Sequence, residues 1–108
     1  MRVATTGDER LATALEGAGH EVVALETPAA GDGATAELSA ALVEFERRLS
    51  EGAADAAAVN GDDDAQVALA LVATKLELPL LRLPPEGAEA ESALGRVLAL
   101  LADDAITA

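Results

Sequence analysis

The chain has 108 residues, the usual size of one domain, and we expect residues 1–108 to form a single domain. Its 20 acidic residues against 7 basic ones give a net charge of −13, which argues against nucleic acids and anionic membranes as partners. It contains no cysteine, which excludes disulfides, thiolate metal sites and cysteine nucleophiles. No secretory signal and no apolar run of membrane-spanning length is visible, so we expect a cytoplasmic protein.

The first half of the chain predicts two strands, each followed by a helix. Residues 3–6 have the composition of a strand, and Asp8 is a suitable N-cap for the helix that follows. Residues 21–25 follow a Gly-rich helix end and predict the second strand. Residues 35–50 predict a helix with one apolar stripe, on whose polar side Glu44 and Arg48 would form an i,i+4 pair.

The second half repeats this alternation. Residues 56–60 are apolar throughout, which is typical of a central strand covered on both faces. A largely apolar helix is expected from Asp62 to Leu76, a fourth strand at residues 80–83 and a last helix at residues 88–102. The order predicts a Rossmann-like three-layer α/β sandwich of four parallel strands in the order 2-1-3-4, with helices on both faces.

Ligands of such sheets bind beyond the carboxyl ends of the strands, where the winding reverses between the first and third strands. In this chain that crevice would be lined by two loops. The candidate ligand-binding residues there are Thr6, Gly7, Asn60, Gly61 and Asp63, with Asp62 beside them.

The run Asp62-Asp63-Asp64 has three readings. Carboxylates in the first turn of a helix interact favourably with its dipole, which would be a purely structural role. They could instead bind a hard cation such as Mg²⁺ or Ca²⁺, or contact sugar hydroxyls. Consecutive residues on a helix point about 100° apart, so the three cannot all bind one ion. We therefore expect no metal site.

Other chemistry is excluded by local sequence. The first loop, Gly7-Asp8-Glu9-Arg10, has one glycine and two acids where a phosphate-binding loop needs several glycines, so we expect no NAD, FAD or other nucleotide cofactor. His20, the only histidine, would lie at the opposite, amino edge of the sheet, which excludes a Ser-His-Asp triad.

Residues 33–83 resemble the N-terminal domain of the non-hydrolysing UDP-N-acetylglucosamine 2-epimerases, members of the GT-B nucleotide-sugar superfamily. Residues 36–42 resemble the helix before the family's central strand, and residues 55–59 resemble the "PDLVLV" strand. Residues 60–70 resemble its "HGDTT-AL-AA" turn and helix, and residues 78–81 its "IPV" segment. The resemblance implies a nucleotide-sugar ligand and places Asp62 at a catalytic acid/base position of the family.

The chain also departs from that family. The "G-T-R-P-E" loop is replaced by residues 7–11, and "HVEAGLR", which supplies a catalytic glutamate, is replaced by residues 82–87, where Glu86 would stand nearest to it. We therefore expect a shortened domain that does not catalyse alone and binds a nucleotide sugar weakly. Two alternatives stay open: an oligomeric interaction or regulatory module without ligand, exposing its edge strands at residues 21–25 and 80–83, or one half of a split nucleotide-sugar enzyme.

Overall fold

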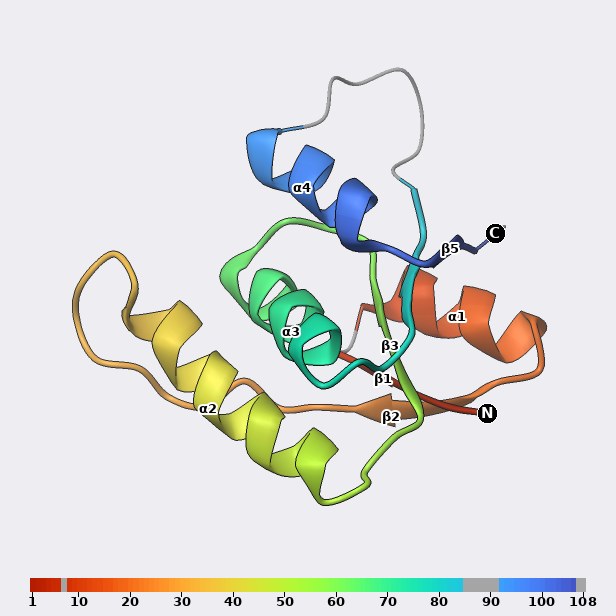
Figure 1. Cartoon of the computed structure of the whole chain (residues 1–108), viewed down its shortest axis with the longest axis horizontal. Helices are drawn as coiled ribbons and strands as arrows, with labels where there is room; N and C mark the ends of the chain where they lie inside the picture. The colour runs from red at the N-terminus through yellow and green to blue at the C-terminus, as the bar shows by residue number, and fades with distance from the viewer. Residues whose placement is uncertain (7, 85–91, 107–108) are drawn as a thin grey trace.

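The structure is a computed structural model that describes residues 1–6, 8–84 and 92–106. Strands and helices alternate along the whole of this range (Figure 1). The strands are β1 (Arg2–Thr5), β2 (Glu21–Ala24), β3 (Ala56–Val59), β4 (Leu80–Arg82) and β5 (Asp104–Ala105). The helices are α1 (Glu9–Gly17), α2 (Ala36–Ser50), α3 (Asp64–Lys75) and α4 (Ala93–Leu101).

All strand pairs are parallel, and the sheet order is β2-β1-β3-β4-β5. The predicted fold class and the predicted order of the first four strands are thus confirmed. The strand β3 lies at the centre, and its four residues are all buried, as its continuous apolar sequence predicts.

The prediction of four strands was wrong by one, because β5 adds a fifth. This strand has two exposed residues, too few for any periodic signal in the sequence. The residues just before and just after it form backbone hydrogen bonds with β4: Asp103 N donates to Leu80 O at 2.8 Å and Ile106 N to Arg82 O at 2.7 Å. As a result β4 is an internal strand rather than the predicted edge.

The helices cover the two faces of the sheet unequally. One apolar cluster joins buried residues of α2, α3 and α4 to the sheet, including Phe45, Leu69 and Leu98. The other contains Leu11 and Leu15 of α1 packed on the opposite face. Figure 1 shows this asymmetry, with α1 on one side of the strands and α2, α3 and α4 on the other. It follows from right-handed crossovers, because only the β1–β2 connection runs toward the β2 edge.

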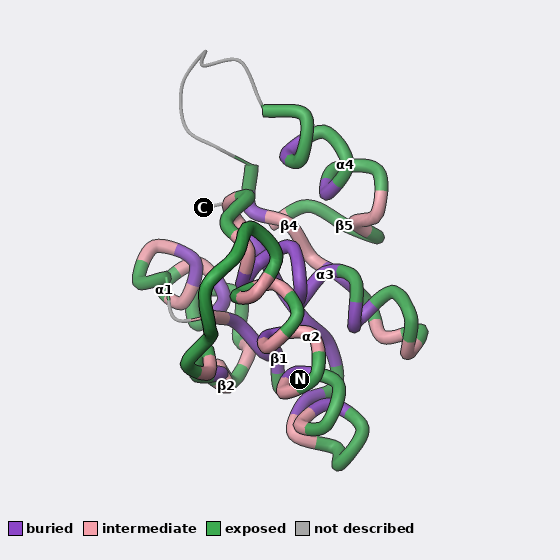
Figure 2. Tube along the Cα trace, turned by 90° about the vertical axis from the view of Figure 1, so that its left-hand side faces the viewer, coloured by how far each residue is buried: buried purple, intermediate pink, exposed green. Residues whose placement is uncertain are grey.

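The helix α3 is the most deeply buried one, and eight of its residues lie in the interior. The helix α4 is the opposite case, since only Gly95 and Leu98 are buried (Figure 2). No helix within the described ranges combines the length and apolarity needed to cross a bilayer.

Candidate functional site

The loop between β3 and α3 carries most of the predicted site residues. The buried strand β3 ends at Val59, and the chain turns through Asn60 and Gly61 before α3 begins at Asp64. Asp63 is the N-cap of α3, and its Oδ1 atom accepts a hydrogen bond from Gln66 N at 3.0 Å. A capping carboxylate satisfies one of the free N–H groups at the start of a helix.

Gln66 organises this loop from inside. It is 6% exposed, and its Oε1 atom accepts hydrogen bonds from Asn60 N at 2.6 Å and from Gly61 N at 3.0 Å. Its Nε2 atom donates to Asp63 Oδ2 at 2.9 Å. All three bonds join the Gln66 side chain to residues of the loop, so the loop is closed by a side chain of the helix that follows it.

Sequence reasoning missed Gln66. The available signal was a single polar residue inside the apolar stretch of residues 65–73, a position where a buried polar group must find partners. Gly61 belongs to the same arrangement, because a Cβ atom there would lie 2.7 Å from Gln66 Nε2. A glycine at this position therefore lets the Gln66 carboxamide pack against the backbone.

Asp62 is an exposed residue of the loop, and its carboxylate reaches a second helix. Its Oδ2 atom accepts a hydrogen bond from the hydroxyl of Ser92, a residue 30 positions away in sequence. Ser92 is the N-cap of α4, where its Oγ atom accepts from Gly95 N at 3.0 Å. Asp62 thus joins the β3–α3 loop to the start of α4.

The end of β1 forms the other side of the site. Thr5 is buried, Thr6 is half-buried, and Gly7 lies outside the described residues. Asp8 caps α1, its Oδ1 accepting from Leu11 N at 2.9 Å, as predicted. Because β1 pairs directly with β3, the loops that follow the two strands lie at the same edge of the sheet.

The side chains of these loops differ in what they can still bind. Both carboxylate oxygens of Asp63 are engaged by Gln66, and so are the N–H groups of Asn60 and Gly61. The carboxylate of Asp62 stays exposed to solvent. In the described part of the chain no three His, Cys, Asp or Glu side chains gather as metal ligands would. The arrangement suits the acceptance of hydrogen bonds from a hydroxyl-bearing ligand.

Two hollows lie away from this edge. One, of about 370 Å³, is at the amino end of β4 and is lined by Thr74, Glu77, Leu78, Pro79, Leu101 and Asp103. The other, of about 240 Å³, lies between α2 and α3 and is lined by Leu42, Glu46, Leu71, Val72, Lys75 and Leu76. His20 directly precedes β2, at the amino edge where it was expected.

Solved structures that share this fold include UDP-GlcNAc 2-epimerases. The structure of S. aureus MnaA with UDP superposes with a TM-score of 0.72 at 16% identity, over 96% of this chain and 37% of that chain. The Neisseria meningitidis UDP-GlcNAc 2-epimerase bound to UDP-GlcNAc gives a TM-score of 0.73 at 13% identity, over 97% and 39%. The Methanocaldococcus jannaschii enzyme in complex with UDP-GlcNAc and UDP gives 0.68 at 18% identity, over 94% and 37%.

No protein-family model matches the sequence, and no curated protein matches it either. The chain spans roughly two fifths of the length of these three proteins. At sequence identities of 13% to 18%, the similarity between this chain and these proteins shows a shared fold and no more. The resemblance predicted from residues 33–83 is thus confirmed in three dimensions: the chain folds like part of a UDP-GlcNAc 2-epimerase.

Proposed function

We propose that this chain is an epimerase-like domain that binds a nucleotide sugar weakly and does not catalyse by itself. The binding site is the carboxyl edge of β1 and β3, with Thr6, Gly7, Asn60, Gly61 and Asp63 around Asp62. The observation that carries the proposal is the exposed carboxylate of Asp62 at this edge, in a fold shared with enzymes whose structures contain UDP or UDP-GlcNAc. Weak here means a dissociation constant of roughly 1 mM, or about −4 kcal/mol.

The absence of catalysis is argued from the groups that surround Asp62. Its neighbour Asp63 has both carboxylate oxygens hydrogen-bonded to Gln66, which holds that side chain in its position as the cap of α3. Moving a proton off and back onto a sugar carbon needs groups held within about 3 Å of that carbon's proton. Asp62 by itself supplies only one group that could transfer a proton. Glu86, which would stand nearest to the family's catalytic glutamate, lies outside the described residues.

The test compares ligand affinity in two variants of equal charge. Asp62→Asn keeps the shape of the side chain and removes its charge, so we expect UDP-GlcNAc to bind about tenfold more weakly, a loss of about 1.4 kcal/mol. Glu16→Gln, on the exposed side of α1, is the control and keeps wild-type affinity. Equal affinity of wild type and Asp62→Asn, measured by NMR titration, would place the site elsewhere.

A second candidate function, self-association, is favoured by the surface of α4. Leu94, Val97 and Leu100 are 47%, 47% and 85% exposed. Residues 93–102 contain no acidic side chain, although the whole chain carries a net charge of −13. We expect a second copy of the chain to bind this face of α4. Copies of so acidic a molecule repel one another except where apolar surfaces without acidic residues meet.

Light scattering on concentrated protein tests this candidate. Replacing Val97 and Leu100 together by serine removes apolar area without adding charge, and we expect the double variant to be monomeric where the wild type forms dimers. Val43→Ser on α2, where Val43 is 71% exposed, is the matched control and should leave the dimer intact. A monomeric wild type at submillimolar concentration would refute self-association.

A further inference from the structure

We infer that Gln66 determines which part of a ligand the β3–α3 loop can bind. It withholds the N–H groups of Asn60 and Gly61 from phosphate and leaves the Asp62 carboxylate to bind sugar hydroxyls. This inference rests on the proposed function and names the chemical group that the site recognises.

The two N–H groups converge on a single oxygen atom. Asn60 N and Gly61 N lie 2.6 and 3.0 Å from Gln66 Oε1. Successive backbone N–H groups that meet at one point form a concave donor site of the kind that binds phosphate in many proteins. In this chain an oxygen of the protein's own carboxamide already fills that point.

The carboxamide is held in place at its other end too. Gln66 Nε2 donates to Asp63 Oδ2 at 2.9 Å, while Asp63 Oδ1 accepts from Gln66 N at 3.0 Å. The residue is 6% exposed, so turning its side chain away would leave buried polar groups without partners. A phosphate would have to displace a carboxamide held by three hydrogen bonds before it could contact the loop.

The groups left to a ligand are of the opposite kind. Asp62 is exposed, its Oδ2 atom accepts a hydrogen bond from Ser92, and a carboxylate has further acceptor positions and donates none when it is ionised. Hydroxyl groups of a sugar are donors that match it, whereas phosphate is an anion that it repels. The loop therefore distinguishes the sugar from the diphosphate of one and the same ligand.

The experiment follows the amide signals of Asn60 and Gly61 by NMR. Gln66→Met keeps the length of the side chain and removes both polar atoms. We expect amide exchange at these two residues to accelerate at least tenfold and inorganic phosphate to shift their signals. In the wild type the same phosphate concentration leaves them unmoved, while N-acetylglucosamine shifts the Asp62 amide. Leu71→Met, five residues further along α3 and 41% exposed, is the control and behaves as the wild type.

Three results would overturn the inference. Phosphate or UDP could shift Asn60 and Gly61 in the wild type, amide exchange could stay slow in Gln66→Met, or this variant could exchange rapidly and still not respond to phosphate. The last result would mean that phosphate is excluded by the neighbouring carboxylates and not by Gln66. Because the wild-type phosphate arm needs no variant, the inference can be refuted even if Gln66→Met does not fold. If no sugar or nucleotide sugar binds the wild type, the proposed function fails, while the phosphate and exchange results still decide the role of Gln66.

Discussion

At the scale of single residues, three helices end in the same way but with different residues at the critical position. After α1 and α2 the chain passes through Gly19 (φ 89°) and Gly52 (φ 85°). After α3 the equivalent residue is Glu77, with φ 60°. Its N–H donates to Thr74 O at 3.2 Å and that of Leu78 to Ala73 O at 2.9 Å, the two bonds of a Schellman motif. A side chain in the left-handed region is strained, whereas glycine is not.

Glu77→Gly is therefore expected to stabilise the protein. The gain should be about 1 kcal/mol in the free energy of unfolding, because the relief of strain outweighs the larger entropy of glycine in the unfolded chain. Urea denaturation measures it. Gly52→Ala is the reciprocal change and should lose about 1 kcal/mol, since it introduces the same strain after α2. A Glu77→Gly protein less stable than the wild type would contradict this reading.

The residues of the candidate site were predictable in position but not in their contacts. Asn60 to Asp63 follow a recognisable central strand, so their location at the carboxyl edge followed from strand order alone. That Asp63 is engaged by Gln66, and Asp62 by Ser92, depends on side-chain geometry across the loop and from α4. A sequence pattern carries no information on such pairings when several donors lie within reach.

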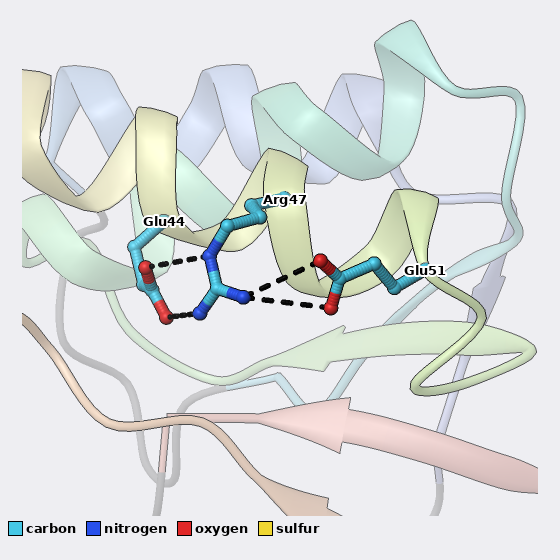
Figure 3. Close-up of polar contacts among 3 residues, drawn as sticks. All are labelled: Glu44, Arg47 and Glu51. Carbon is cyan, nitrogen blue, oxygen red and sulfur yellow. Dashed lines mark hydrogen bonds and ion pairs between the residues drawn. The ribbon is translucent and has the colours of Figure 1, made fainter.

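At the scale of elements, α2 also contains a side-chain pairing that the sequence pattern did not determine. The expected Glu44–Arg48 pair is replaced by a Glu44–Arg47 pair, in which Glu44 Oε1 and Arg47 Nη2 lie 2.6 Å apart. Arg47 Nη1 also lies 3.4 Å from Glu51 Oε1 (Figure 3). Residues three and four apart are both neighbours on a helix, so spacing alone does not choose between them. The hydrogen bond from Arg47 lowers the pKa of the Glu44 carboxyl below its ordinary value of 4.5.

This shift predicts the pH dependence of the pair. A carboxyl whose pKa is lowered by folding stabilises the folded state above its unfolded pKa, and this contribution is lost as the pH falls through the folded pKa. Replacing Arg47 by Met should raise the pKa of Glu44 toward 4.5, as followed by the NMR signal of its carboxyl carbon. The stability difference between wild type and Arg47→Met should be greater at pH 7 than at pH 3, although small, because Arg47 is 54% exposed.

An unchanged pKa of Glu44 in Arg47→Met would show that the pair does not persist in solution. Leu38→Met, a conservative change in the same helix, is the control for effects on the helix as a whole. It should leave the titration of Glu44 unaltered.

At the scale of the whole molecule, alternation of strands and helices determined most of the fold in advance. Each strand and helix of the first four β-α units was expected within a few residues of its observed bounds, apart from the first part of the last helix, where residues 88–91 lie outside the described range. The strand β5 was missed because two residues joined by backbone hydrogen bonds leave no periodicity to detect. The edge of the sheet is therefore at Asp104 and not at Leu80.

The proposed function also depends on the arrangement of the whole sheet. One parallel sheet brings the ends of β1 and β3 together at its centre, and the exposed carboxylate of Asp62 lies there in a fold shared with UDP-GlcNAc 2-epimerases. The rest of the loop is closed by Gln66. The proposed function therefore requires that the ligand binds at this edge and not in the hollow between α2 and α3.

The most direct measurement is a map of amide signal changes in ¹⁵N-labelled protein on titration with UDP-GlcNAc. The account predicts changes that centre on Thr6 and Asp62 and saturate at roughly millimolar ligand. Changes centred instead on Leu42 and Leu76, which line the hollow between α2 and α3, would contradict it, as would a spectrum that does not change at all.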